Sequence, residues 1–135
     1  MLLEQIDGGF VATVPCKLNL YLSVLGKRED GYHELDTIMV AVSLCDRLIM
    51  LPNQSGNWNL RVEFSGNRPL SPTDRAWDVP SDSRNLVLRA LKTYVQSMGI
   101  QNAGADLILQ KSIPSMAGLG GGSADAAAAL ALAQL

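Results

Sequence analysis

Glycine occupies four of the five positions from 118 to 122, directly before Ser123 and an alanine-rich stretch. Glycines let backbone amides approach a ligand closely, and the free N–H groups and positive dipole end of a following helix favour an anion. The segment is not a Walker A loop, because no Lys-Ser/Thr pair follows the glycines, and the dinucleotide fingerprint would need glycine at Ser123. The spacing predicts a phosphate cradle; the alternative is a turn that only lets a strand and a helix pack closely.

Asp125 lies two residues after Ser123, where the predicted helix begins. An acidic side chain in the first turn suits the helix dipole but repels phosphate unless it points away or acts through a bound Mg²⁺. The sequence leaves these two roles of Asp125 open.

Two further pairs of side chains could bind a ligand. Lys17 and Asn19 are two positions apart on a leucine-rich strand, so both leave the same face of the sheet and could hold a hydroxyl or a phosphate. Tyr32 and His33 follow a glycine turn and could stack on or hydrogen-bond to a base. A solvated strand face and a structural histidine are the alternatives.

The first half of the chain is expected to form an antiparallel sheet. A strand is predicted over 10–25, where Leu18, Leu20, Leu22 and Val24 alternate with polar residues, which places one face in the core. A second strand is predicted over 32–44, with 46–51 continuing as a separate strand. Alternation over 58–64 predicts another strand, joined through the preceding NQSGN loop as a hairpin.

The second half is expected to supply the helices. Residues 66–83, rich in proline and polar residues, are predicted to form a surface excursion. A helix is then predicted over about 84–98, capped by Asp82 or Ser83 and ended by Gly99. A short strand over 105–110 and a helix over 123–135 complete the prediction.

Composition limits the classes of function. The chain has 135 residues, 47% hydrophobic and 18% charged, with a formal net charge of −2, which is typical of one soluble domain with its own core. Neither nucleic acid nor a membrane is an expected partner, because clustered basic residues and long apolar runs are lacking. Cys16 and Cys45 are expected to be reduced, buried thiols outside any zinc site. The N-terminus lacks a signal-peptide or transit-peptide pattern, so a cytoplasmic location is predicted, or an organellar stroma in a plastid-bearing source.

Three stretches taken together resemble the GHMP kinase superfamily: PCKLNLYLSVLGKREDGYHELDTIM, SRNLVLRA and IPSMAGLGGGSADAAAAL. The resemblance runs from about Val14 to the end. It implies an α+β fold, the GHMP N-terminal domain of ribosomal protein S5 domain 2-like architecture, with a mixed, largely antiparallel sheet and helices on one face. Ser123 is followed by Ala124, where the family usually has a second serine.

The resemblance also implies an activity: ATP-dependent phosphorylation of the 2-hydroxyl of a cytidine diphosphate derivative of methylerythritol, in non-mevalonate isoprenoid synthesis. ATP is the implied co-substrate and Mg²⁺ its companion, with no residue assigned as a metal ligand. Lys17 is implied as catalytic, and Asn19, Tyr32 and His33 as substrate-binding. The implied ATP-binding residues are Asn85, Leu86, Lys111, Pro114, Met116, Ala117, Gly118, Leu119, Gly120, Gly121, Gly122, Ser123 and Ala124.

The same resemblance implies that residues 1–135 are an ATP-binding N-terminal domain without the C-terminal GHMP domain and without the family's catalytic Asp. The chain is then expected to be inactive alone and to expose apolar surface around Leu130, Leu132 and Leu135. The alternatives are a non-catalytic nucleotide-binding module, a GHMP kinase for another small alcohol, and an RNA-binding domain of related architecture, which the acidic charge disfavours.

Overall fold

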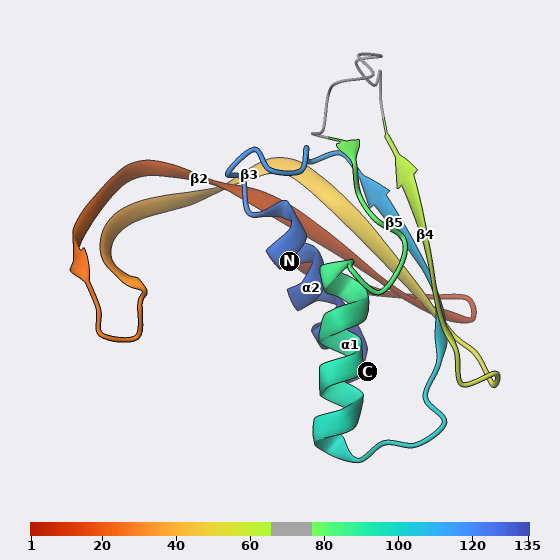
Figure 1. The fold of residues 1–135 in the computed structure, drawn as a ribbon. Coiled ribbons are helices and arrows are strands. Elements are labelled where there is room, and N and C mark those ends of the chain that lie inside the picture. Colours follow the sequence, from red (N-terminus) through yellow and green to blue (C-terminus); the bar gives the residue numbers. More distant parts are fainter. Residues whose placement is uncertain (66–76) are drawn as a thin grey trace.

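Two helices lie on one face of a five-stranded sheet in the computed structural model, which describes residues 1–65 and 77–135 (Figure 1). The expected α+β class is therefore confirmed. In chain order the elements are β1 (Leu2–Ile6), β2 (Gly9–Lys27), β3 (His33–Pro52), β4 (Trp58–Phe64), α1 (Leu86–Met98), β5 (Ala105–Lys111) and α2 (Gly121–Leu132).

The sheet is mixed, with the strand order β1-β2-β3-β5-β4. All neighbours are antiparallel except β4 and β5, which run parallel. The predicted hairpin between β3 and β4 is wrong, because β5 lies between them. The reason is burial: Ala105, Leu107 and Leu109 of β5 are buried and suit an interior strand, whereas β4 carries Arg61 and Glu63 and forms the edge.

Two strands differ in extent from the prediction. The segment 46–51 is not a separate strand but continues β3, which pairs with β2 along almost its whole length. Irregularities in this pairing at Pro15/Lys17, Asn19/Tyr21 and Val24/Gly26 accompany the long, curved hairpin in Figure 1. The sequence analysis missed β1, an edge strand that is exposed along its whole length.

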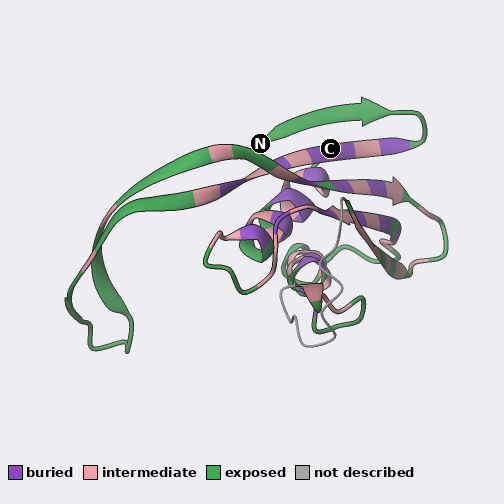
Figure 2. Ribbon diagram, turned by 90° about the horizontal axis from the view of Figure 1, so that it is seen from above, coloured by how far each residue is buried: buried purple, intermediate pink, exposed green. Residues whose placement is uncertain are grey.

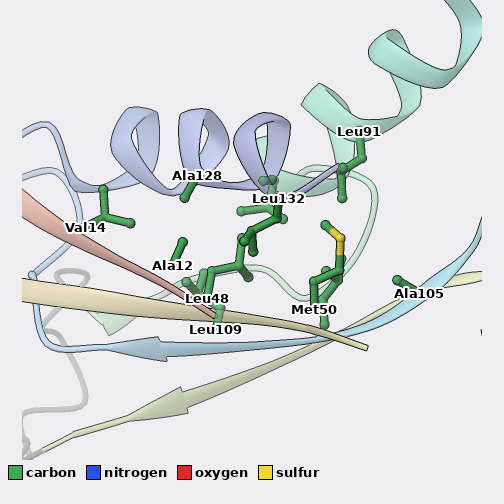
Figure 3. Packing of buried hydrophobic residues seen from close by; sticks show 12 residues of the cluster. Ala12, Val14, Leu48, Met50, Leu91, Ala105, Leu109, Ala128 and Leu132 are labelled. Carbon is green, nitrogen blue, oxygen red and sulfur yellow. The ribbon is translucent and has the colours of Figure 1, made fainter. Parts of the chain in front are cut away.

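The core fills the space between the helices and the sheet (Figure 3). From the sheet it takes Ala12 and Val14 of β2, Leu48 and Met50 of β3, and the buried residues of β5. From the helices it takes Val87, Leu91, Ala128, Ala129 and Leu132. Alanines on α2 let its backbone come close to the sheet, which brings the beginning of this helix near the strands.

The outer part of the β2–β3 hairpin lies outside this core. Figures 1 and 2 show it projecting beyond the helices, with most of its residues exposed. Leu20 is 68% exposed, and Leu18, Leu22 and Val24 are exposed as well, so the prediction that this face is core is wrong. Apolar and polar residues do alternate along this part of β2, but neither helix extends far enough along the hairpin to cover the apolar face.

The ends of the helices also differ from the predictions. Helix α1 is capped by Asn85, whose side chain accepts a 2.9 Å hydrogen bond from the Val87 N–H, while Asp82 pairs with Arg84 instead. Gly99 ends α1 in the left-handed conformation, as predicted. Helix α2 begins at Gly121 rather than Ser123. Of its terminal leucines, Leu135 is exposed, Leu130 is half-buried and Leu132 is buried, against expectation.

Residues 66–76 of the predicted surface excursion lie outside the described residues. Cys16 and Cys45 are free thiols; Cys16 is buried as expected, whereas Cys45 is only half-buried. In the part of the chain that the structure describes, no helix is long and apolar enough to cross a membrane.

Candidate functional site

The glycine-rich loop joins the end of β5 to α2 and adopts a backbone that needs glycine at two positions. Gly118 and Gly120 have φ values of 72° and 75°, in the left-handed region that other residues rarely adopt. Met116 also has a positive φ of 59°, and its side chain is exposed. The loop therefore turns sharply twice before the helix begins.

Helix α2 presents free donors at its N-terminus. Its N-cap is Gly120, which has no side chain to cap the first turn, and the Ala124 N–H is the first to bond back to the helix, at 3.0 Å to the Gly120 carbonyl. The preceding N–H groups of the first turn have no partner within the helix. A hollow of about 230 Å³, lined by Leu86 and residues 114–123, lies against them. Such a helix terminus suits an anion.

Strand β2 brings Lys17 to this loop. The Lys17 N–H donates a 3.0 Å hydrogen bond to the carbonyl oxygen of Leu119. A Cβ on Gly120 would lie 3.2 Å from Cγ and 3.4 Å from Cε of Lys17, so the lysine side chain runs directly past the N-cap. The structure thus brings the predicted catalytic lysine together with the predicted phosphate cradle.

A second hollow of about 250 Å³ adjoins the first, and the two share Leu86, Ser115, Met116 and Gly122 in their linings. Asn85 and Lys111, predicted to line an adenine pocket, are also part of its lining. Two neighbouring hollows of this kind could take the base and the phosphates of one nucleotide. Among the predicted ATP-binding residues, Ala124 lines neither hollow.

Two of the three predicted substrate residues, Tyr32 and His33, lie at the hairpin tip rather than at this loop. Asn19 is exposed on β2 opposite Met39, His33 pairs with Lys27 near the hairpin tip, and Tyr32 at the tip is 73% exposed. The hairpin extends away from the helices in Figure 1. Their role in binding a cytidine stays a prediction.

An ion cluster that was not predicted from the sequence lies next to the loop. Lys111 Nζ binds Asp46 and, at 2.8 Å, Asp125, and all three side chains are buried. The structure pairs the Asp125 side chain with Lys111, at the lining of the second hollow. Burial raises the pKa of Asp125 to about 6, although the Lys111 ammonium opposes the shift.

A pattern in the sequence could have revealed this cluster. Asp46 precedes Leu48 and Met50 with period two, and Lys111 follows Leu107 and Leu109 in the same way, so both belong to the buried faces of their strands. Asp125 shares a helix face with Ala128, Ala129 and Leu132 by its spacing. Charged residues on three apolar faces indicate that they neutralise one another.

Known proteins share this architecture. Residues 85–135, which include α1, β5, the loop and α2, match the family model of the GHMP kinases N terminal domain. This chain contains a GHMP kinase N-terminal domain. The chain is also similar to a solved 4-(cytidine 5'-diphospho)-2C-methyl-D-erythritol kinase. The sequences are 41% identical and the structures agree with a TM-score of 0.64, over 92% of this chain and 39% of that one. The fold expected from the resemblance is thus confirmed.

Curated relatives of this GHMP domain carry one name. The chain is 47% identical over 122 residues to a 4-diphosphocytidyl-2-C-methyl-D-erythritol kinase of Deinococcus radiodurans, covering 90% of this chain and 36% of that protein. It is 45% identical over 119 residues to a kinase of the same name of Pelotomaculum thermopropionicum, covering 88% of this chain and 37% of that protein. The chain therefore spans little more than a third of the length of these relatives. A homoserine kinase of Cytophaga hutchinsonii, 17% identical with a TM-score of 0.64 over 97% of this chain and 36% of that one, shares the fold.

Proposed function

We propose that this domain binds ATP and serves the phosphorylation of 4-diphosphocytidyl-2-C-methyl-D-erythritol, the reaction for which its relatives are named. The observation that carries the proposal is the uncapped N-terminus of α2, which faces a hollow bounded by the glycine loop with Lys17 alongside. This arrangement offers backbone donors and one cation to a chain of phosphates, and supports phosphoryl transfer, which depends on positioning and charge.

Each residue of the site is assigned a role by the part of the ligand that it would contact. The first-turn N–H groups of α2 and the Ser123 hydroxyl are proposed to bind phosphate oxygens, and Lys17 to stabilise the charge on the transferred group. Leu86, from the lining shared by the two hollows, is proposed to lie against the base. Asn19, Tyr32 and His33 are proposed to hold the cytidine-linked acceptor.

ATP supplies the phosphoryl group when bound, and the residues present fit its phosphates for the reasons given above. They do not form a Mg²⁺ site of their own. Within residues 1–65 and 77–135 no three His, Cys, Asp or Glu side chains gather as a metal site, and Asp125 next to the loop is engaged with Lys111. We therefore assign no step to Mg²⁺, which stays predicted as a companion of the ATP phosphates.

We also propose that residues 1–135 are the nucleotide-binding N-terminal domain of a GHMP kinase, in line with the family match and the share of the relatives covered. A cytoplasmic location stays a prediction. The competing proposal is a nucleotide-binding module without catalysis, and the domain alone would serve either role.

The deciding experiment is a thermal-unfolding scan of this chain alone, with ATP and Mg²⁺, and with cytidine diphosphate. A ligand that binds only the folded state raises the midpoint. We expect ATP to raise it, and homoserine, the substrate named for a fold relative, to leave it unchanged. Transfer of labelled phosphate from ATP to 4-diphosphocytidyl-2-C-methyl-D-erythritol, measured on the longer kinase of which this chain is proposed to be the N-terminal domain, then separates a kinase from a binding module. A midpoint insensitive to ATP contradicts both proposals.

A further inference from the structure

The buried ion cluster of Asp46, Lys111 and Asp125 joins three elements at one point. Lys111 is the last residue of β5, Asp46 lies within β3, and Asp125 lies in the first half of α2. The ammonium of Lys111 binds a carboxylate oxygen of each aspartate, and each of the three side chains is at most 3% exposed. The cluster is therefore almost completely closed to solvent, although Lys111 and Asp125 belong to the lining of the second hollow.

The cluster holds the near end of the glycine-rich loop. The second carboxylate oxygen of Asp46 accepts hydrogen bonds from the backbone N–H groups of Ser112 at 2.6 Å and Ile113 at 2.9 Å. These are the two residues that lead from β5 into the loop. Their backbone direction, and with it the starting point of the loop, is therefore set by a β3 side chain.

The same cluster holds the far end of the loop. Asp125 attaches α2 to Lys111, and Gly121 at the start of this helix lies so close that a Cβ there would be 2.9 Å from Cγ2 of Ile113 and 3.3 Å from Nζ of Lys111. Both ends of the loop formed by residues 114–120 therefore lie close to the ammonium of Lys111. Between these two ends, the loop has two left-handed glycines, and the Lys17 N–H bonds to its Leu119 carbonyl.

If the only role of the cluster were to stabilise the fold, burying these three charged side chains would be an unfavourable way to do so. Two carboxylates surround one ammonium in a buried place, and Oδ1 of Asp125 has no hydrogen-bond partner among the described residues. Apolar residues of similar volume often stabilise a fold as well as a buried ion pair does or better. A buried charged group is well suited, however, to fixing one geometry, because each polar contact has a direction.

We propose that Asp46, Lys111 and Asp125 are positioning residues of the phosphate site: together they lock both ends of the glycine-rich loop in the conformation that presents the α2 N-terminus. This role rests on the proposed function, because it concerns the same site. It also assigns Lys111 to the support of the loop rather than to direct contact with adenine.

The first test is amide hydrogen exchange on this chain and on Asp125→Asn, which keeps the shape of the side chain and removes its charge. We expect exchange over residues 112–124 to become at least about tenfold faster, while the amides of α1 and of the β1–β2 pair stay as they are. The matched control is Asp106→Asn, on the same strand as Lys111, whose carboxylate accepts a hydrogen bond from the exposed Asn59. Unchanged exchange over 112–124 overturns the proposal.

The second test separates positioning from general stability. In the double variant Lys111→Met, Asp125→Asn the cluster keeps its formal charge of −1, since one ammonium and one carboxylate are removed from two carboxylates and one ammonium. Inorganic triphosphate is the probe, because it has the phosphates of ATP without the adenosine. We expect its dissociation constant to rise at least about tenfold even at a temperature where the variant is fully folded. An unchanged constant in the folded double variant overturns the proposal.

The two tests also distinguish the failure of this proposal from the failure of the proposed function. If the original chain binds neither ATP nor triphosphate, the proposed function is contradicted, and hydrogen exchange still decides whether the cluster locks the loop. If the original chain binds triphosphate and neither variant changes exchange or binding, only the positioning role is contradicted.

Discussion

The backbone N–H of Lys17 donates a 3.0 Å hydrogen bond to the carbonyl oxygen of Leu119. This bond joins strand β2 to the glycine-rich loop, two segments that are about a hundred residues apart in the chain. It also sets the lysine side chain beside Gly120, the N-cap of α2. The cation and the helix donors are thus placed together by the fold rather than by sequence proximity.

Replacing Gly120 by alanine is expected to weaken ATP binding. Gly120 has a φ of 75°, and the added Cβ would lie 3.2 Å from Cγ of Lys17, so the loop must change its backbone or displace the lysine. We expect a loss of affinity of about tenfold, for a strain of about 1–2 kcal/mol, measured by calorimetric titration with ATP. Gly26→Ala is the matched control, because a Cβ there meets nothing within 4 Å. Equal affinity in the two variants would contradict the cradle geometry.

Replacing Gly121 by valine is expected to destabilise the fold itself. A side chain here is also predicted to block the phosphates of ATP, and the structure shows the glycine packed against the segment that follows β5, where a Cβ would lie 2.9 Å from Cγ2 of Ile113. We expect overpacking to lower the free energy of unfolding by about 1–3 kcal/mol, measured by urea denaturation without any ligand. Gly122→Ala places its Cβ at ordinary contact, 3.4 Å from Leu86, and serves as the control. A fully stable Gly121→Val chain would refute this packing.

Local patterns in the sequence were enough to predict the elements around the site. The glycines before Ser123, the period of α1 and the stop at Gly99 predicted the loop and both helices to within a few residues. The position of β5 between β3 and β4 could not be read in this way, because it depends on which strand buries more apolar surface in the finished sheet. The chain order suggested a hairpin that the packing does not form.

The exposed hairpin shows a second limit of local patterns. Leu18 and Leu20 have the alternation of a buried strand face, yet the helices cover only the inner part of the sheet. Period two tells which residues share a face, but not whether another element covers it. Asp46, Lys111 and Asp125 fail in the opposite sense: they follow the spacing of apolar core residues, and the tertiary structure shows that they are buried together as ion pairs.

The stability of the chain is expected to depend on pH through Asp125. Its pKa is raised from the ordinary value of 3.8 to about 6, chiefly by burial. The folded chain therefore keeps a proton that the unfolded chain has already lost, so the stability contributed by this group is fully present below about pH 4 and is lost as the pH rises through about 6. Denaturation of this chain and of Asp125→Asn across that range measures the effect as a difference. Parallel pH profiles would contradict the raised pKa.

Replacing Asn85 by alanine tests whether this residue supports the site by capping α1. Its side chain accepts a 2.9 Å hydrogen bond from the Val87 N–H and donates one of 2.6 Å to the Pro80 carbonyl. We expect Asn85→Ala to lower the free energy of unfolding by about 1–2 kcal/mol. Asn85→Ser keeps a cap acceptor and removes the group that contacts the Pro80 carbonyl, so it is expected to recover most of the capping contribution. Equal loss in both variants would show that the cap contributes little.

Replacing Lys17 by methionine is expected to separate catalysis from binding. The methionine keeps the apolar stem that passes Gly120 and removes the ammonium, while the backbone bond to Leu119 remains. Because the proposed role of the charge is to stabilise the transferred phosphoryl group, kcat should fall by about a hundredfold or more while the affinity for ATP falls by less than about tenfold. The measurement is phosphoryl transfer to 4-diphosphocytidyl-2-C-methyl-D-erythritol by the longer kinase of which this chain is proposed to be the N-terminal domain, with ATP binding measured by titration. The control is Lys92→Met, at an exposed position of α1 that lines neither hollow. Equal losses of turnover and affinity in Lys17→Met would place Lys17 in ground-state binding instead.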